Sequence, residues 1–148
     1  MTRAGDDDGR PFRPRLARAV SLAIATLVVL LTALLVTALA AVPWSDRTGI
    51  ALVGLAVAWF CWREAAVVAR PDATGLTVRN LIVVRRLDWA EIVDVRFGEG
   101  RPWVQLDLAD GGTLAVMAIQ RADGGAARAQ ARRLATLVAR HSATAADD

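Results

Sequence analysis

The sequence lacks several residue types on which catalytic and metal-binding sites depend. Its 148 residues contain no lysine, no tyrosine, one cysteine, Cys61, and one histidine, His141. A single cysteine excludes an intramolecular disulfide and a cysteine-based zinc site. Because Cys61 lies inside an apolar run and His141 lies near the end of the chain, a Cys/His dyad has almost nothing to be built from. We therefore expect a protein that is not an enzyme, with no catalytic residues, no cofactor and no metal site.

Charge is also scarce. Hydrophobic residues make up 55% of the chain and charged residues 22%, with a net charge of +3. The basic residues, all of them arginine, do not concentrate into a stripe, so no nucleic-acid partner is expected. The length allows one small domain beside a membrane segment and leaves no room for two full domains.

The sequence does contain a long uncharged apolar run, Val20–Val42. As a helix, its roughly 23 positions extend about 34 Å, enough to cross a hydrocarbon core about 30 Å thick. The run predicts a transmembrane helix at about residues 20–42. A cleaved secretory signal is the alternative, because Ala38-Leu39-Ala40 fits an A-x-A cleavage site, but the run exceeds a usual signal core and a second apolar segment follows it.

That second segment predicts a transmembrane helix at about residues 50–69. The break before it, Pro43–Gly49, has a proline, a tryptophan and little net charge, as expected for an external loop. Gly54 and Ala58 are small residues four positions apart, a spacing that allows close packing against the first helix.

Arg63 and Glu64 interrupt the second apolar segment. We expect Arg63 to reach the lipid headgroups from near the helix end, at a boundary marked by Trp59 and Trp62. The alternative is that Arg63 and Glu64 act inside the membrane as a relay or a gate.

Flanking charges set the expected orientation. Residues 1–19 have no apolar periodicity and are expected to be a disordered basic N-terminus. Four arginines precede the apolar run: Arg10, Arg13, Arg15 and Arg18. Positive charge beside a first membrane helix stays in the cytoplasm, and two crossings return the chain there. We expect a multi-pass protein of the cell inner (plasma) membrane with both termini cytoplasmic.

After the second helix the chain changes to short β-rich pieces separated by turn residues, the pattern of a small antiparallel sheet or barrel. Alternation predicts a strand around Leu76 and Val78, then a tight turn at Asn80 and a β-branched strand, Leu81–Val84. Two later strands each have three residues predicted on the buried face: Val93, Val95 and Phe97, then Val104, Leu106 and Leu108. The sequence Asp110-Gly111-Gly112 predicts a hairpin turn after them.

The last part predicts one helix from about Gly125 to Arg140, with Asp123 as its N-cap. An apolar stripe along it is suited to pack on the sheet: Ala127, Ala131, Leu134, Leu137 and Val138. Arginines mostly take the other side, so the alternative is a helix that lies on anionic lipid. Residues 142–148 have nothing to bury and are expected to be a disordered tail.

Two short sequences carry a resemblance to a known family: Trp89-Ala90-Glu91-Ile92 and Arg101-Pro102-Trp103. With DATGLTVRN and DGGTLAVMAIQ around them, the stretch from about Pro71 to Gln120 resembles the bacterial PH-like domain of small actinobacterial membrane proteins, one of which is called a low-molecular-weight protein antigen. The resemblance implies a membrane α-helical hairpin followed by a small α+β PH-like domain over residues 71–141, a bent, partly open antiparallel β-barrel capped by a C-terminal helix. It implies no activity.

Eukaryotic PH domains hold phosphoinositides with basic residues around the loop between their first two strands. In this chain that connection is only Arg79-Asn80, and Arg85 and Arg86 fall at the far end of the next strand, so this mode of binding is not expected. Arg79, Arg85 and Arg86 are still the candidate lipid-facing residues, because an arginine near an anionic leaflet gains roughly 1 kcal/mol. Interleaved carboxylates leave the domain nearly neutral, so a mixed solvated surface is the alternative.

The leading hypothesis is a non-enzymatic, membrane-tethered interaction module at the cytoplasmic face that recruits or assembles with an unknown protein partner, because tethering raises local concentration. Trp89 and Trp103 are the candidate anchors of that interface, unless each packs against a strand edge. The second hypothesis is a module that binds anionic lipid through Arg79, Arg85 and Arg86. A transporter or channel subunit would need a polar path that Arg63 and Glu64 alone do not supply.

Overall fold

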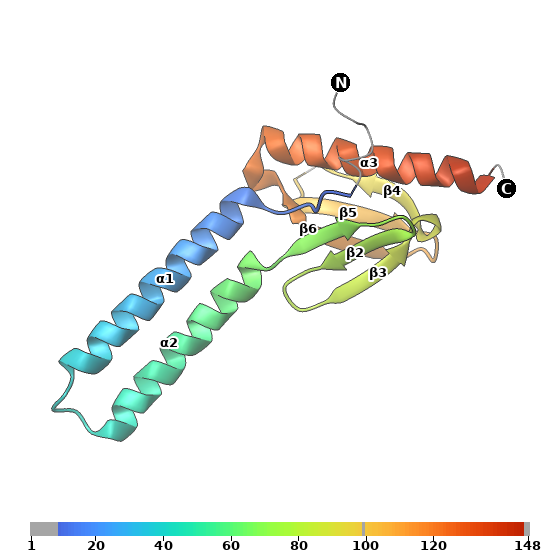
Figure 1. Cartoon of the computed structure of the whole chain (residues 1–148). Helices are drawn as coiled ribbons and strands as arrows, with labels where there is room; N and C mark the ends of the chain where they lie inside the picture. The colour runs from blue at the N-terminus through green and yellow to red at the C-terminus, as the bar shows by residue number, and fades with distance from the viewer. Residues whose placement is uncertain (1–8, 99, 147–148) are drawn as a thin grey trace. The chain divides into compact units, whose positions relative to one another are not determined.

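The computed structural model describes residues 9–98 and 100–146, which form two structural units. One unit, Leu16–Ala66, is a pair of helices. The other unit combines the chain up to Arg15 with the chain from Val67 onward and contains the sheets and the last helix (Figure 1). The predictions made for residues 1–8 and 147–148 lie outside the described residues.

The helices α1 (Arg15–Ala38) and α2 (Trp44–Ala65) correspond to the two predicted membrane helices. With 24 and 22 residues, they are long and apolar enough to cross a membrane, by length and composition. Both lie four to six residues earlier in the chain than the predicted spans, 20–42 and 50–69. Two of the arginines before the apolar run, Arg15 and Arg18, belong to α1, and Pro43, whose fixed φ suits a helix start, precedes the first turn of α2.

The two helices of this unit approach each other closely at Gly54. A Cβ atom added at Gly54 would lie 2.1 Å from Oγ1 of Thr32. The predicted close packing is therefore confirmed at Gly54, where a hydrogen is the largest side chain that fits. Arg63 lies in the last turn of α2, near the helix end as predicted, and its guanidinium is 5.8 Å from the centroid of the Trp59 ring.

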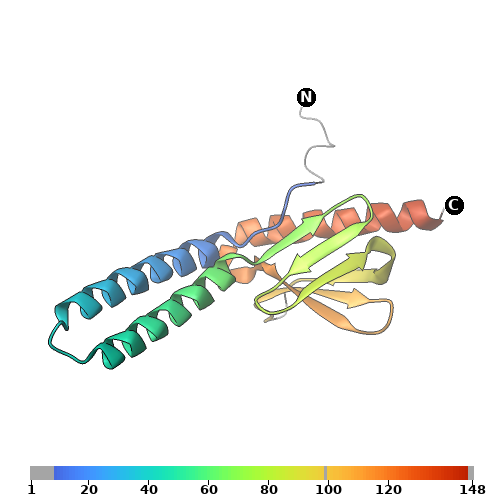
Figure 2. The ribbon, with the colours of Figure 1, turned by 60° about the horizontal axis from the view of Figure 1, so that its bottom comes forward.

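Within the described residues, six strands form two three-stranded antiparallel sheets. Sheet A has the order β1 (Val68–Pro71), β2 (Gly75–Arg79), β3 (Val84–Asp88), and sheet B has the order β4 (Ile92–Arg96), β5 (Trp103–Leu108), β6 (Thr113–Gln120). The 3₁₀ turn η1 (Trp89–Glu91) joins the sheets, and a second one, η2 (Arg121–Asp123), precedes α3 (Gly125–Ala146). Figure 2 shows α3 running along the sheets, where it packs against β4, η1 and β6. The predicted PH-like fold is confirmed, but over the described residues the sheets stay separate and do not close into a barrel.

The core of the second unit lies between the two sheets and α3. The strands contribute these buried residues: Leu76, Val78, Leu87, Val104, Leu106, Leu108, Val116 and Ile119. The helix contributes the predicted stripe: Ala127, Ala131, Leu134, Leu137 and Val138. Because the core covers this stripe, it is not available to lipid, contrary to the alternative that the sequence left open. The helix continues to Ala146, past the predicted end and into the predicted tail.

One strand differs from the predicted alternation. The pairing of β4 with β5 shifts between Ile92 and Asp94, which is the mark of a β-bulge. As a result Ile92 enters the core and Val93, predicted to be buried, is exposed. Val95 and Phe97 are partly buried against the core. The side chain of Val93 therefore faces the side opposite to the predicted one, whereas Val95 and Phe97, which follow the bulge, face the predicted side.

Residues 9–15, within the N-terminal segment predicted to be disordered over residues 1–19, are instead part of the second unit. Phe12 is 1% exposed and exchanges two backbone hydrogen bonds with Ala69 of β1, at 2.8 and 3.1 Å. The guanidinium of Arg133 lies 4.4 Å from the centroid of the Phe12 ring. The backbone N–H of Arg15 donates to the carboxylate of Asp123 at 2.8 Å. Asp123, predicted as the N-cap of α3, therefore holds the backbone of the N-terminal segment.

Candidate functional site

Three consecutive aliphatic side chains are exposed where β2 connects to β3. We call Ile82, Val83 and Val84 the apolar loop, and their side chains are 82%, 53% and 61% exposed. The sequence predicts a strand from Leu81 to Val84 after a turn at Arg79-Asn80, and this prediction is wrong. The connection is longer, Asn80–Val83, and β3 begins only at Val84. The strand register pairs Arg79 with Val84, so the four residues between them must turn the chain whatever their strand propensity.

Asn80 fixes the base of the apolar loop. Its side-chain Nδ2 donates to the carbonyl oxygen of Ala115 at 2.7 Å, and its Oδ1 accepts from the backbone N–H of Met117 at 3.1 Å. Both partners belong to β6 of the other sheet, so the amide side chain bridges the two sheets through bonds of the kind that a neighbouring strand would make. The connection Asn80–Val83 is therefore held in position from its first residue, two residues before the apolar loop.

Three arginines share the outer face of sheet A. We call Arg70, Arg79 and Arg86 the basic face. The register pairs Arg70 with Thr77 and Thr77 with Arg86, and Arg79 follows Thr77 by two residues on β2. Directly paired residues and alternate residues of a strand lie on one face of a sheet. Because Arg79 pairs with Val84, Val84 of the apolar loop lies beside Arg79 on the basic face.

Of the three predicted lipid-facing arginines, Arg79 and Arg86 are brought together on this face and Arg85 is not. Arg85 lies between Val84 and Arg86, so it projects from the opposite side of β3. Its Nη2 lies 3.7 Å from the carboxylate of Asp110, in the turn between β5 and β6. Sequence reasoning did not select Arg70 as a site residue, because its place beside Arg86 follows only from the strand register.

Arg86 also binds the turn between β1 and β2. Its guanidinium lies 3.0 Å from the carboxylate of Asp72 and donates to the hydroxyl of Thr74 at 2.6 Å. Hydrogen bonds from the backbone N–H of Thr74 and then from its hydroxyl, with a smaller contribution from the charge of Arg86, hold the pKa of the Asp72 carboxyl below its ordinary value. The carboxylate is therefore charged at neutral pH and offsets part of the charge of Arg86. Arg70 and Arg79 have no such ion pair within the described part of the chain.

The two tryptophans predicted as interface anchors have different environments. Trp89 is 5% exposed, its ring stacks on that of His141 with centroids 4.6 Å apart, and its Nε1 donates to the carbonyl oxygen of Asp72 at 3.0 Å. It is a core residue in this structure, which favours the packing alternative. Trp103 is half-buried and lies on the outer face of sheet B, two residues before Gln105 on β5. Of the two, Trp103 is the one that a partner can reach.

The apolar loop lies at the end of sheet A where the chain enters from α2. Val68 is the first residue of β1 and pairs with Arg79, which pairs in turn with Val84. The loop residues 80–83 extend beyond this row, in the direction from which β1 comes. Only Ala66 and Val67 separate α2 from β1.

Comparison with known proteins agrees with this fold. Residues 65–136 match the family model described as Bacterial PH domain. This part of the chain is similar to bacterial PH domains, and we call the structural unit that contains it the PH domain. Over 97 residues, the chain is 35% identical to three uncharacterised proteins, Mb1452 of Mycobacterium bovis and MT1460 and Rv1417 of Mycobacterium tuberculosis. The matched part is 66% of this chain and 63% of each relative, so the chain spans less than two thirds of their length. No solved structure matches the chain.

The apolar loop offers aliphatic surface, and the basic face of the PH domain offers guanidinium groups, which donate hydrogen bonds. Among residues 9–98 and 100–146, no group of three or more histidine, cysteine or carboxylate side chains is arranged to hold a metal ion.

Proposed function

We propose that this chain is a non-enzymatic, membrane-anchored interaction module whose PH domain binds the anionic membrane surface through the apolar loop and the basic face. The observation that carries the proposal is the exposure of Ile82, Val83 and Val84 beside that face. Contiguous exposed apolar side chains mark contacts with proteins or membranes. Flanking arginines favour a membrane, because aliphatic side chains enter the interface while guanidinium groups stay at the level of the phosphates.

The energies suit a module that is already anchored. Fully burying one aliphatic side chain of this size contributes about 1.5–3 kcal/mol. Each arginine near an anionic leaflet contributes roughly 1 kcal/mol. A few such contacts give weak binding to a free domain, because association carries a large entropic cost. A membrane anchor removes most of that cost by keeping the domain at high effective concentration beside the lipid.

The connectivity of the chain supports this proposal. Three residue steps lead from Ala65, the end of α2, to Val68, the start of β1, and they span at most about 10 Å. We infer that α1 and α2 cross the plasma membrane as a hairpin, with both of its ends on the cytoplasmic side, where the arginines before α1 are retained. The apolar loop, at the end of sheet A nearest to Val68, then stays within reach of the inner leaflet.

The test uses the full chain in lipid nanodiscs with a single reporter. Ile82→Cys in a Cys61→Ala background carries an environment-sensitive fluorophore at the loop tip. Ala73→Cys, in the exposed turn between β1 and β2 at the other end of sheet A, is the matched control. In discs with anionic lipid, we expect the emission of the probe at residue 82 to shift to the blue and to be quenched by nitroxide-labelled lipid, and the probe at residue 73 to stay in water.

Two further comparisons test whether the basic face contributes to the membrane contact of the apolar loop. Replacing Arg70 and Arg79 by glutamine should reduce the shift in anionic discs, and added salt should do the same, because screening weakens contacts between exposed charges. A probe at residue 82 that reports water in neutral and anionic discs alike would contradict the proposal.

A second candidate function is recruitment of a protein partner by the outer face of sheet B. The observation in its favour is Trp103, a half-buried aromatic residue on that face, since tryptophan is enriched among residues that dominate interface energies. A photoreactive residue in place of Gln105 should form one discrete adduct in cells, and Trp103→Ala should abolish it. Absence of a discrete adduct, or an adduct unchanged by Trp103→Ala, would argue against this candidate.

A further inference from the structure

We propose that the outer edge of β3, the side that faces away from β2, binds an extended acidic peptide segment of a partner protein. The segment adds to sheet A as a fourth strand. The backbone of Val84 and Arg86 supplies the hydrogen bonds, and the side chains of Arg85 and Arg86 supply the charge. The membrane contact proposed above uses exposed side chains of the apolar loop, whereas this site uses the backbone of the strand.

The sheet order leaves four strands at an edge: β1 and β3 of sheet A, and β4 and β6 of sheet B (Figure 1). A strand at an edge presents unpaired backbone N–H and C=O groups, which can pair with another chain unless something covers them. Among the described residues, groups of the chain itself cover three of these edges, and the edge of β3 is left open.

The edges of β1 and β6 are closed by hydrogen bonds. Ala69 of β1 exchanges two backbone hydrogen bonds with Phe12, so the segment before α1 occupies this edge. On β6, the side-chain amide of Asn80 bonds the carbonyl oxygen of Ala115 and the backbone N–H of Met117. Asn80 thus takes the place of a neighbouring strand.

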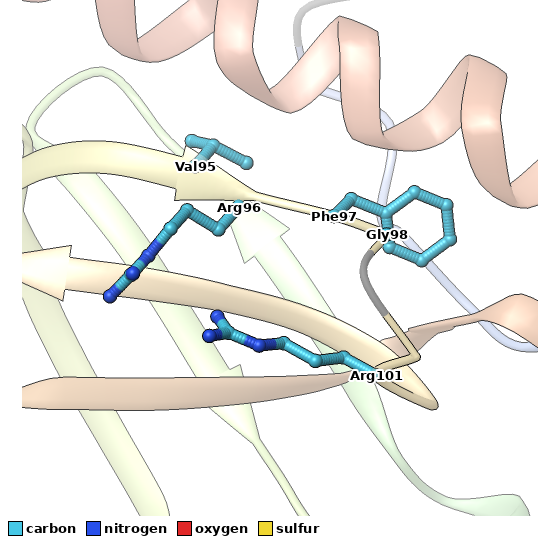
Figure 3. Close-up of a pocket in the computed structure, with 5 residues that line it drawn as sticks. All are labelled: Val95, Arg96, Phe97, Gly98 and Arg101. Carbon is cyan, nitrogen blue, oxygen red and sulfur yellow. The ribbon is translucent and has the colours of Figure 1, made fainter.

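The edge of β4 is closed by a side chain, a bulge and a helix. The backbone N–H of Val95 donates to the carboxylate of Asp94 at 2.8 Å, and the bulge after Ile92 interrupts the regular ladder. The helix α3 packs against β4. Figure 3 shows the side chain of Val95 on the side of β4 where α3 lies, and that of Arg96 on the other side. These are the features by which proteins protect edge strands.

The pairing of β3 with β2 shows which backbone groups face its open edge. In an antiparallel pair, opposite residues alternate between pairs that exchange backbone hydrogen bonds and pairs that do not. The backbone N–H of Asn80 donates to the carbonyl oxygen of Val83 at 2.9 Å, so this pair is a bonded one. Every second residue after Val83 then bonds β2, which makes Arg85 and Leu87 the bonded residues of β3.

The remaining residues of β3, Val84, Arg86 and Asp88, direct their backbone groups to the edge. The N–H of Asp88 agrees with this direction, because it donates to the carboxylate of Glu91 at 2.7 Å, beyond the end of the strand. Within the described part of the chain, the backbone groups of Val84 and Arg86 have no partner. Two N–H and two C=O groups are therefore open to an added strand, which ends where Glu91 begins.

A second copy of this chain is a poor occupant of the edge. An antiparallel pairing of two copies through both open residues sets Val84 opposite Arg86 and the two Arg85 side chains opposite each other. Like charges that are directly opposite destabilise a pair of strands. A strand that carries carboxylates at these positions gains the attraction that a second copy loses.

Both arginines of β3 can bind a carboxylate of the added strand. Arg85 lies 3.7 Å from Asp110, and its side chain is still 42% exposed. Arg86 lies 3.0 Å from Asp72, and its side chain is 55% exposed. Because a guanidinium has five N–H donors, each arginine can serve a second carboxylate. We therefore expect two adjacent acidic residues in the peptide, with an aliphatic residue on each side, since β3 has an aliphatic residue on each side of its arginines.

The test uses the full ¹⁵N-labelled chain in a non-ionic detergent, without a bilayer. The probe is the capped synthetic peptide Thr-Val-Glu-Glu-Val-Thr at millimolar concentration, whose sequence reads the same in both directions and so suits either strand direction. We expect hydrogen exchange at the backbone amides of Val84 and Arg86 to slow several-fold, because these amides gain acceptors. The amides of Arg85 and Leu87, already bonded to β2, are the internal control and should change little.

Altered peptides separate backbone pairing from charge. With the two glutamates opposite the two arginines, the backbone groups of the third and fifth peptide residues face β3 in either strand direction. N-methylation of these two residues should abolish binding, whereas N-methylation of the second and fourth should not. Glutamine in place of both glutamates should weaken binding about threefold or more, as expected from the loss of two exposed charge pairs.

Variants of the chain test the same two contributions. Val84→Pro removes an N–H that faces the edge and none that bonds β2, and proline is tolerated at such positions of edge strands. It should weaken binding about fivefold or more, the effect of leaving a hydrogen bond unmade. Arg85→Gln should weaken binding about as much as the loss of one glutamate. Its matched control, Arg132→Gln at an exposed position of α3, should leave binding unchanged.

The proposal is overturned if the Val84 and Arg86 amides exchange at the same rate with and without peptide, or if both methylated peptides bind alike. Protection of these amides that rises with protein concentration in the absence of peptide would identify a second copy as the occupant and would also overturn it. The result is independent of the membrane contact, because this test contains no bilayer and reads no probe at residue 82.

Discussion

Phe12 is one of the residues that attach the N-terminal segment to the PH domain. Its ring is buried, Arg133 lies over it, and its backbone pairs with Ala69. The guanidinium of Arg133 also donates to the carbonyl oxygen of Arg10 at 2.6 Å, so it holds the segment by its backbone as well. The segment is therefore attached by packing, by a cation–π contact and by hydrogen bonds within three residues.

Phe12→Ala should lower the free energy of unfolding by about 3–5 kcal/mol, because it removes a fully buried aromatic side chain and leaves a cavity. Denaturant titration of the full chain in micelles, followed by near-ultraviolet circular dichroism, measures the change. Pro11→Ala is the control, since Pro11 is exposed in the same segment. A loss below about 1 kcal/mol for Phe12→Ala would mean that the ring is not part of a cooperative core.

Residues differ in how far the sequence predicts their roles. The stripe of α3 was predicted residue by residue, because a helix repeats every 3.6 residues and the sequence repeats with it. Phe12 was missed, because one aromatic residue between prolines has no period and its partner, Ala69, is remote in the sequence.

At the scale of elements, α1 and α2 approach each other closely where Gly54 faces Thr32. Gly54→Ala should destabilise the helix pair by about 1–3 kcal/mol, because the new Cβ would overlap Thr32. Gly49→Ala is the matched control. It lies in the same helix with nothing within 4 Å of the added Cβ, and alanine favours a helix over glycine, so it should be neutral or stabilising. Titration with a denaturing detergent, followed by helical circular dichroism, measures both. Equal effects would show that the helices do not pack at Gly54.

The strands of the PH domain were predicted where alternation is regular and missed where it is interrupted. The hairpin of β5 and β6 was predicted, because alternation and the glycines of its turn agree. The apolar loop was taken for a strand, because β-branched residues favour strands and nothing local shows that the register needs four residues to turn. The bulge in β4 likewise appears only once β5 is paired with it.

At the scale of the whole molecule, the PH domain is built from two separate stretches of the chain. Its core contains Phe12 and Val67 from either side of the helical unit Leu16–Ala66. The domain predicted from the sequence, residues 71–141, lacks Phe12 and most of β1. The helical unit is thus an insertion in the domain, and the domain is linked to it through both of its ends.

This division predicts which shortened chains fold. A chain in which residues 16–66 are replaced by a flexible linker of about 12 residues, with an r.m.s. span of about 20 Å, should give dispersed amide signals in a ¹H–¹⁵N spectrum. The fragment 71–141 should not, because it loses one edge strand of sheet A and the ring that fills the core beside it. A third chain, with the linker but with Phe12→Ala, should unfold at lower denaturant concentration than the first. Dispersed signals from the fragment 71–141 would show that sheet B, α3 and the β2–β3 hairpin suffice for a stable core. The N-terminal segment would then be a strap on a finished domain rather than one of its strands.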